Sequence, residues 1–449
     1  MVSTSMPSAR RETFFLLLGD AAFLVLSLWA ALTLRNLNVP TWPYFLEHLR
    51  VFVFVYAISF LIFFISGLYE RQTRLVKRIL GIRILGAQVA NTAIAAVVFF
   101  ALPLSIAPKT VLALYLVISV ILISAWRFFV VPYLSLNPRQ DAVLVAEGEV
   151  ADQLYGEVRD NPRYYVRFAK HIVPSVSSDG QLARELEEAV RSGVELIVLD
   201  SRDPNVRAQL PTLYTAMLSG AEFVEFSVFY ESFFDRVPLA HIDHAWLLEH
   251  LPHRNVAYAI AKRAIDTAGA LVGLVIAAPF ILIAALFIRF SAGEIFIRHE
   301  RVGKGGSHFR IIKLRTMLLD DHGDPELQKK NRVTRLGKFL RKTRIDELPQ
   351  LVNVLAGDLS FIGPRPELPA IAATYEQEIP YYDVRHLLTP GLSGWAQIYN
   401  YDAPRGAADV ERTRIKLSYD IYYLKHRSFG LDMAIALKTL RALFAFSGT

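Results

Sequence analysis

Four long apolar segments near the start of the chain constrain its fold more than any other feature of the sequence. They extend from Phe14 to Leu34, from Val51 to Tyr69, from Ile82 to Leu102 and from Val111 to Tyr133. At the rise of an α-helix, each can cross the roughly 30 Å hydrocarbon core of a bilayer. The first is too uninterrupted for a signal peptide and lacks its small-residue cleavage pattern. We therefore predict a membrane protein with a four-helix transmembrane bundle in residues 1–136, and a composition of 53% apolar and 20% charged residues agrees with this.

Positive charge predicts the orientation of these helices. Lys and Arg gather before the first segment, in the second loop and after the fourth segment: Arg10, Arg11, Arg71, Arg74, Lys77, Arg78 and Arg139. By the positive-inside rule, the N-terminus, the second loop and the chain just after Tyr133 are cytoplasmic. Arg83 and Arg127 lie near helix ends, where we expect their side chains to extend to the membrane surface.

The pattern changes after Asp141, where strand-like apolar runs alternate with helix-like segments until about Glu231. The runs are DAVLVAE, YYVRFAKHIV, VELIVLD and AEFVEFSVF. Such alternation predicts a parallel, Rossmann-like α/β domain within residues 137–254. A dinucleotide site needs G-x-G-x-x-G after the first strand, but the turn AEGEVADQL has only Gly148. We therefore expect a degenerate domain that acts as a spacer or dimerisation module.

A fifth apolar segment, residues 268–290, contains Pro279 near its centre. Proline inside a helix removes a hydrogen bond and kinks the chain. Lys and Arg flank both ends of the segment, so the positive-inside rule favours the same side of the membrane for both. Two interpretations remain open on these residues: a re-entrant hairpin, or a kinked helix that crosses the membrane and places the C-terminal part outside.

The region after this segment is strongly basic, with 14 Lys or Arg and 5 Asp or Glu between Arg298 and Arg344. Alternating runs around GKGG predict a β-hairpin rather than a P-loop, which needs G-x-x-x-x-G-K-[ST]. The predicted second strand presents Arg310, Lys313 and Arg315. The excess of positive charge indicates an anionic ligand, either lipid headgroups or a phosphorylated substrate.

An adjacent acid pair, Asp346 and Glu347, follows the basic region. Pro349 and Gly357 predict a short helix from about Glu347 to Ala356, with Asp346 at its N-cap. Acids at this position are also ordinary helix capping, so the pair alone does not identify a catalytic site.

Two later segments complete the pattern. In GPRPE, Arg365 lies between two prolines that hold it on a stiff backbone, although a turn with an incidental Arg is the alternative. The closing segment, ERTRIKLSYDIYYLKHRSFGLDMAIALKTLRALF, predicts an amphipathic helix pair for a membrane surface or for packing under the hairpin. The chain has no cysteine, which excludes disulfides, a thiolate nucleophile and a zinc-thiolate site.

Five motifs in this order resemble the catalytic domain of the bacterial sugar transferases, the monotopic polyprenyl-phosphate hexose-1-phosphate transferases. They are KLRTM, RKTRIDELPQL, DLSFIGPRPE, TPGLSGWAQ and LSYDIYYLKHRSFGLDM. The resemblance covers about Ala257 to Phe446, and the whole layout is similar to the large exopolysaccharide-initiating members. One departure is Ala278, where the family commonly has Ser before the membrane proline.

For the fold, the resemblance implies that residues 255–449 form a small α/β catalytic domain with a re-entrant membrane helix bent at Pro279 and amphipathic interfacial helices. For the activity, it implies transfer of a sugar 1-phosphate from a UDP-sugar to undecaprenyl phosphate. UMP would be released through a covalent aspartyl-phosphosugar intermediate, as the first membrane step of exopolysaccharide or O-antigen synthesis. It also implies a bacterial inner-membrane protein with the catalytic domain on the cytoplasmic face.

For the site, the resemblance implies that Asp346 is the nucleophile and that Glu347 binds Mg²⁺, with Asp346 as a second ligand. It further implies four cations around the substrate phosphates: Lys313, Arg315, Arg341 and Arg365.

The expected partners are UDP-sugar, undecaprenyl phosphate and membrane lipid, and a homodimer is expected for the whole chain. Nucleic acid is not expected, because the basic region lacks a known binding motif. The resemblance makes glucose or galactose the default sugar and leaves acetamido sugars open. An alternative role for the N-terminal half is that of a scaffold or regulatory module in a polysaccharide assembly complex.

Overall fold

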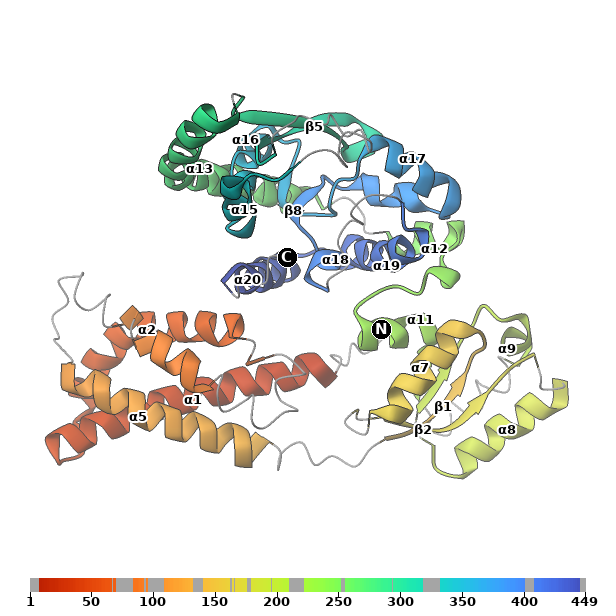
Figure 1. The fold of residues 1–449 in the computed structure, drawn as a ribbon. Coiled ribbons are helices and arrows are strands. Elements are labelled where there is room, and N and C mark those ends of the chain that lie inside the picture. Colours follow the sequence, from red (N-terminus) through yellow and green to blue (C-terminus); the bar gives the residue numbers. More distant parts are fainter. Residues whose placement is uncertain are drawn as a thin grey trace. The chain divides into compact units, whose positions relative to one another are not determined.

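The computed structural model is drawn in Figure 1. It describes residues 8–66, 68–69, 84–92, 94–95, 109–131, 140–161, 164, 166–175, 179–194, 196–209, 222–251, 255–292, 294–317, 332–399 and 408–444. The chain divides into two units, residues 1–138 and 139–449.

Long apolar helices form the first unit. They are α1 (Ser8–Asn36), α2 (Trp42–Ile65) and α5 (Lys109–Ala125), and α5 continues into a π-helical turn, η1 (Trp126–Val130). All three helices are long and apolar enough to cross a membrane, as is α13 (Val256–Ala292) in the second unit. Of the predicted third segment, residues 84–92 and 94–95 are helical, and the rest lies outside the described residues. These helices fit the predicted membrane protein.

The prediction for Arg127 is wrong, because its side chain is buried among the helices of the first unit. Its Nε and Nη2 atoms donate to the two carboxylate oxygens of Asp20 at 3.2 and 2.5 Å. The hydroxyl of Tyr69 also donates to Asp20, at 2.8 Å, and Arg127 Nη1 donates to the carbonyl of Leu68 at 2.7 Å. A charged side chain inside a membrane protein is tolerated when it is paired with an opposite charge and hydrogen-bonded. The ion pair therefore ties α1 to η1 and to Leu68 and Tyr69, which follow α2. Arg83 lies outside the described residues.

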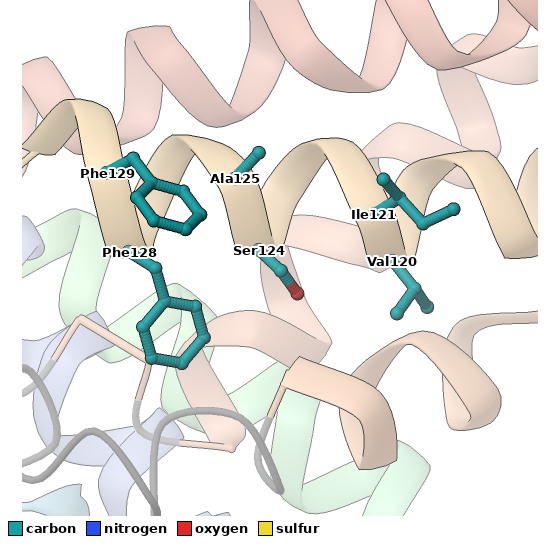
Figure 2. A pocket seen from close by; sticks show the side chains of 6 residues that line it. All are labelled: Val120, Ile121, Ser124, Ala125, Phe128 and Phe129. Carbon is teal, nitrogen blue, oxygen red and sulfur yellow. The ribbon is translucent and has the colours of Figure 1, made fainter.

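An open groove of about 520 Å³ runs along α5 (Figure 2). Its lining is apolar except for one hydroxyl: Val120, Ile121, Ser124, Ala125, Phe128 and Phe129. It carries no ionisable side chain, so it has nothing with which to bind a phosphate.

The second unit begins with a four-stranded parallel sheet in the order β2-β1-β3-β4. Its elements are β1 (Gln140–Val145), α7 (Glu149–Asp160), β2 (Val166–Ile172), α8 (Asp179–Arg191), β3 (Leu196–Leu199), α9 (Pro204–Ala208), β4 (Glu222–Glu225) and α11 (Phe226–Phe234). Alternate residues of β1 enter different cores: Ala142 and Leu144 pack with α7 and α11, and Val143 and Val145 pack with α8. The predicted parallel α/β sheet is therefore present, with helices on both faces.

The fourth strand is shorter than the predicted run AEFVEFSVF, because the chain becomes helical at Phe226. Phe226, Phe229 and Tyr230 all lie in the core of this domain. Their spacing of i, i+3 and i+4 is that of one face of a helix. The aromatic residues of this segment favoured a strand in the prediction. The segment is a helix because that conformation buries all three side chains on one face.

The chain then crosses to the C-terminal domain through η2 (Leu239–His241) and α12 (His244–His250). Val237, Ile242 and Trp246 are buried in one cluster with Tyr375 and Ile421 of the C-terminal domain. The indole N–H of Trp395 donates to the carbonyl of Asp235 at 2.8 Å. The connector therefore contributes to the core of the C-terminal domain.

The C-terminal domain combines the long helix α13 with short strands and helices. After α13 come β5 (Phe296–Val302), β6 (His308–Leu314), α15 (Arg335–Lys342), α16 (Gln350–Ala356), β7 (Ser360–Ile362), α17 (Pro369–Glu378), η5 (Tyr382–Leu387), β8 (Gly391–Ser393), α18 (Trp395–Ile398), α19 (Val410–His426) and α20 (Phe429–Phe444). Strands β5 and β6 form the predicted antiparallel hairpin, and β7 pairs in parallel with β8. The last two helices are the predicted pair, although α19 is mostly buried and packs inside the domain.

Helix α13 contains Pro279 and is helical on both sides of it. Its ribbon does not run straight in Figure 1. Many of its large apolar side chains are more than half exposed, among them Val275 at 71%, Ile276 at 64%, Leu282 at 69% and Phe290 at 83%. Exposed apolar surface of this extent on a soluble protein is rare and indicates contact with lipid.

Candidate active site

The acid pair lies in a tight 3₁₀ turn, η4 (Ile345–Glu347), between α15 and α16. The predicted helix from Glu347 with an Asp346 cap is wrong in detail, because the α-helix begins at Gln350 and the Asp346 side chain caps no helix. The turn starts at Arg344, whose φ of 58° lies in the left-handed region. A non-glycine residue in the left-handed region changes the direction of the chain sharply. No sequence pattern around Arg344 indicates this backbone conformation.

Helix α16 fixes the position of this turn through Asn353. The Asn353 amide donates to the carbonyl of Arg310 at 2.8 Å and accepts from the N–H of Ile312 at 3.1 Å. It therefore pairs with the open edge of β6 in the way a neighbouring strand would. Arg263 of α13 holds the other end of α16 by donating to its last carbonyls at 2.7 Å. The acid pair is thus anchored to both the hairpin and the membrane helix.

Asp346 is only 8% exposed, and its Oδ1 atom has no hydrogen-bond partner among the described residues. Burial, together with the negative charge of Glu347, raises the pKa of the Asp346 carboxyl to about 6. Lys313, Arg341 and Arg344 act in the opposite direction and limit the rise. The carboxylate is therefore ionised at neutral pH but poorly solvated, which suits a nucleophile.

Glu347 has the opposite shift, although it is only one residue away. Burial alone would raise the pKa of its carboxyl, but Lys313 and Arg365 outweigh burial and hold that pKa at about 2. Lys313 Nζ lies 2.9 Å from one carboxylate oxygen, and Arg344 Nη1 lies 3.6 Å from the other. The pair thus has one permanently charged member and one that titrates near neutrality. Such separation is typical of carboxylates with different roles in one site.

Three of the four predicted phosphate-binding cations lie near the acid pair. Lys313 contacts Glu347, Arg365 lowers the pKa of Glu347, and Arg341 lowers the pKa of Asp346. Arg341 is also held by its Nε, which donates to the hydroxyl of Thr316 at 2.9 Å. Arg315 differs, because its Nη2 pairs with Glu294 at 2.9 Å. The hairpin brings the residues before β5 and after β6 together, and this turns Arg315 toward the base of the hairpin.

A crowded backbone crossing holds the segment that carries Arg365. The N–H of Gly391 donates to the carbonyl of Pro364 at 2.9 Å. A Cβ on Gly391 would lie 2.1 Å from the backbone nitrogen of Gly363, so only glycine allows this approach. The carbonyl of Arg365 itself accepts a hydrogen bond from Arg385 at 2.9 Å.

Arg385 belongs to a buried network of four charges, with Glu367, Lys416 and Asp420, beneath the Arg365 segment. Each side chain is only 2% exposed. Lys416 contacts Glu367, and Arg385 lies 2.8 Å from Asp420 and 3.7 Å from Glu367. Sequence reasoning missed this network. Its one signal is a Lys and an Asp four residues apart, Lys416 and Asp420, on an otherwise apolar helix face in KLSYDIYY.

Sequence reasoning also missed Arg344 and Arg301. Arg344 pairs with Glu347, as described above, and its charge lowers the pKa of both acids. Arg301 lies on β5, and the charges of Glu347 and Glu367 act on it. The alternation of the hairpin could have indicated Arg301, because it shares a face with Lys313.

Asp346 and Glu347 could hold a divalent cation. Their carboxylate oxygens are the hard donors that Mg²⁺ prefers, and Asp346 Oδ1 is an oxygen without a donor within the described structure. The described residues bring no group of three or more His, Asp or Glu side chains together. A Mg²⁺ ion at this site would take its remaining ligands from water and phosphate oxygens, as is usual for this ion.

The chain is similar to known proteins over this domain. A family model described as bacterial sugar transferase matches residues 257–446. A protein of Aeromonas hydrophila named UDP-N-acetylgalactosamine-undecaprenyl-phosphate N-acetylgalactosaminephosphotransferase is 42% identical over 223 residues, 49% of this chain and 51% of that protein. A UDP-glucose:undecaprenyl-phosphate glucose-1-phosphate transferase of Caulobacter vibrioides is 40% identical over 196 residues, 43% of this chain and 73% of that protein.

One shorter relative matches only part of this chain but over nearly its own full length. The exopolysaccharide production protein PSS of Rhizobium leguminosarum bv. phaseoli is 37% identical over 189 residues. The match covers 94% of that protein but only 40% of this chain. The chain spans about half the length of the Aeromonas relative.

Proposed function

Because the chain belongs to the bacterial sugar transferase family, we propose that it transfers a sugar 1-phosphate from a UDP-sugar to undecaprenyl phosphate and releases UMP. The Aeromonas and Caulobacter relatives act on UDP-sugars and undecaprenyl phosphate according to their names. The observation that carries the proposal for this chain is the acid pair, whose two pKa values are about 6 and about 2 within a ring of cations. Such a site can attack a phosphate and stabilise the charge that develops on it.

In the proposed first step, an ionised oxygen of Asp346 attacks the β-phosphorus of the UDP-sugar. A bond forms between that oxygen and phosphorus, and the bond from phosphorus to the α-phosphate oxygen breaks, so UMP leaves with the electron pair. In the second step, a phosphate oxygen of undecaprenyl phosphate attacks the same phosphorus, and the Asp346 carboxylate leaves unchanged. Dividing the transfer into two displacements keeps the two anionic substrates from having to meet directly.

The cations have separate tasks in this proposal. Lys313 holds Glu347 in place through their 2.9 Å contact, while Arg365 and Arg341 offset the negative charge of the incoming phosphates. The carboxylates of Glu347 and Asp346 would hold Mg²⁺, which supplies positive charge to phosphate oxygens in phosphoryl transfer. Arg315 pairs with Glu294 and is proposed to support the base of the hairpin.

The pH dependence follows from the raised pKa of Asp346. We expect the rate of UMP release to rise with pH through about 6 and then to level, because only the ionised carboxylate attacks. Glu347→Gln removes a negative charge that raises this pKa, so the acid limb of its residual activity should move to lower pH. Single-turnover UMP release between about pH 5 and pH 8 measures the acid limb of the wild type and that of Glu347→Gln.

The matched control for this shift is Glu294→Gln, which removes a side chain that is 74% exposed and paired with Arg315. It should leave the acid limb where it is in the wild type. An acid limb that stays in place in Glu347→Gln would show that a group other than Asp346 controls the rate.

We further propose that α13 enters and leaves the membrane through the cytoplasmic face. Arg263, near its start, binds the carbonyls at the end of α16, and Ile288, near its end, packs with Leu314 of β6. In a straight helix these two positions would be roughly 37 Å apart, more than the thickness of the hydrocarbon core. Asn353 joins α16 to β6, so both ends of α13 contact one small domain. A bend at Pro279 is the proposed cause.

Single cysteines test this topology cleanly, since the chain has none of its own. Arg191→Cys precedes α13 and Lys304→Cys follows it, at exposed positions of α8 and of the hairpin tip. Both should react with a membrane-impermeant maleimide only after spheroplasts are permeabilised. Asn38→Cys, exposed between α1 and α2, should react in intact spheroplasts. Labelling of Lys304→Cys from outside, with Arg191→Cys protected, would support a helix that crosses the membrane instead.

The experiment that tests the function itself is UMP release by the purified chain in the presence of undecaprenyl phosphate and Mg²⁺. UDP-glucose and UDP-N-acetylgalactosamine are the first donors to try, because they match the names of the two relatives. The donor that is turned over identifies the sugar. No UMP release from any UDP-sugar would contradict the proposal.

A further inference from the structure

The inner face of the β5–β6 hairpin carries one cation that the mechanism above does not use. Along β5, Arg298 and Glu300 are exposed, whereas Arg301 is half-buried. Directly opposed residues of an antiparallel pair lie on the same face. Arg301 therefore shares the inner face with Lys313, whose side chain contacts Glu347 at 2.9 Å.

The end of β5 is fixed beside the Arg365 segment. The N–H of Val302 donates to the carbonyl of Glu367 at 3.0 Å, and this places Arg301 next to the segment that presents Arg365. Arg301 Nε is buried and has no hydrogen-bond acceptor in the part of the chain that the structure describes. Burial and the positive charge of Arg365 both lower the pKa of Arg301, whereas the charges of Glu367 and Glu347 act in the opposite direction.

The two carboxylates nearest Arg301 already have cationic partners. Glu367 contacts Lys416 and lies 3.7 Å from Arg385, while Glu347 contacts Lys313 and Arg344. A buried arginine beside a second arginine is unfavourable unless an anion joins them. The planar fork of a guanidinium fits the oxygens of a phosphate, and a charge-assisted bond of this kind is strong in a partly buried site.

We infer that Arg301 binds a phosphate group of a substrate together with Arg365. The inference rests on the proposed sugar-phosphate transfer and adds a residue to the same site. The phosphate can come from two sources, the diphosphate of the UDP-sugar or the phosphate of the lipid acceptor. Arg301 lies within the electrostatic range of Glu347, so either phosphate would be held where the transfer takes place.

The test compares Arg301→Gln with Arg298→Gln in the full-length protein. Arg298 is the matched control, since it lies on the same strand and its side chain is exposed on the opposite face. UMP affinity is measured by calorimetry without lipid, and KM is measured for the UDP-sugar and for undecaprenyl phosphate. Loss of a charge-assisted hydrogen bond predicts a change of about tenfold to a hundredfold for Arg301→Gln. Arg298→Gln should behave as the wild type.

The two sources give different results. Weaker UMP binding with a raised KM for the UDP-sugar assigns Arg301 to the nucleotide diphosphate, and a raised KM for undecaprenyl phosphate alone assigns it to the acceptor. Arg301→Lys keeps the positive charge and the aliphatic part of the side chain but lacks the planar guanidinium. It should show the same defect in milder form, which controls for an effect on folding. Affinity and both KM values equal to those of Arg298→Gln would overturn the inference. Failure of the proposed function would appear separately, as a wild type that releases no UMP.

Discussion

Asp346→Asn should abolish UMP release while the protein remains folded and becomes more resistant to heat at neutral pH. The amide has nearly the same shape as the carboxyl but cannot attack phosphorus, so we expect a loss of more than about a thousandfold, as for removal of other nucleophiles. The measurement is UMP release with saturating UDP-sugar and undecaprenyl phosphate. Asp383→Asn, which changes an exposed carboxylate of the same domain, is the control and should keep full activity.

The gain in stability follows from the sign of the pKa shift. The carboxyl of Asp346 has a pKa of about 6 in the folded chain, above its ordinary value of 3.8. The folded state therefore disfavours the ionised form, and this cost begins near pH 4 and is complete above about pH 6. Asn carries no charge, so its variant should unfold at a higher temperature than the wild type at pH 7.5 and at a similar temperature at pH 4. The cost removed is on the order of 3 kcal/mol. Full UMP release by Asp346→Asn would contradict the mechanism.

Lys416→Met should strongly destabilise the C-terminal domain, because it leaves the buried carboxylate of Glu367 without its nearest cation. Breaking one partner of a buried ion pair costs roughly 3–5 kcal/mol. The double variant Lys416→Met with Glu367→Gln removes one charge of each sign and should recover most of that loss. The temperature of thermal unfolding measures both effects in the full-length protein.

Measuring activity shows whether the buried charge network only stabilises the fold or also positions Arg365. Arg385 donates to the carbonyl of Arg365 at 2.9 Å and lies 3.7 Å from Glu367, so a change at Glu367 reaches the phosphate site through one residue. We expect the double variant to be folded but to have a raised KM for the UDP-sugar. Arg159→Met removes an ion pair that is 65% and 67% exposed, and it should change neither unfolding nor KM. A double variant as unstable as Lys416→Met would show that charge pairing is not what the network supplies.

Local patterns in the sequence predicted the elements of the second unit well. The hairpin was predicted from two alternating runs around GKGG, and the predicted parallel sheet and closing helix pair are also present. Each of these depends on residues that are neighbours along the chain. The start of α16 was mispredicted because Arg344 adopts a left-handed backbone, which lets a 3₁₀ turn precede the helix.

Contacts between distant residues could not be predicted in this way. Arg127 is 107 residues from Asp20, and Lys416 is 49 residues from Glu367. Nothing in the local sequence of either arginine or lysine indicates its partner. The contact between Arg315 and Glu294, 21 residues apart, is of the same kind, and the predicted phosphate-binding role of Arg315 stays a prediction. The acid pair was assigned a catalytic role through its motifs, and its geometry explains why those residue types suit the role.

The pairing of Asp20 with Arg127 has a consequence for how the chain is made. A ribosome adds about 5 to 20 residues each second, so helix α1 emerges roughly 5 to 20 s before the arginine that neutralises its aspartate exists. During that interval a carboxylate in the first membrane helix has no partner from α5. Insertion machinery must therefore shelter α1, or admit it with the carboxyl protonated, until α5 arrives. A nascent chain stopped before α5 should be a target for membrane proteases, and the completed bundle should escape them.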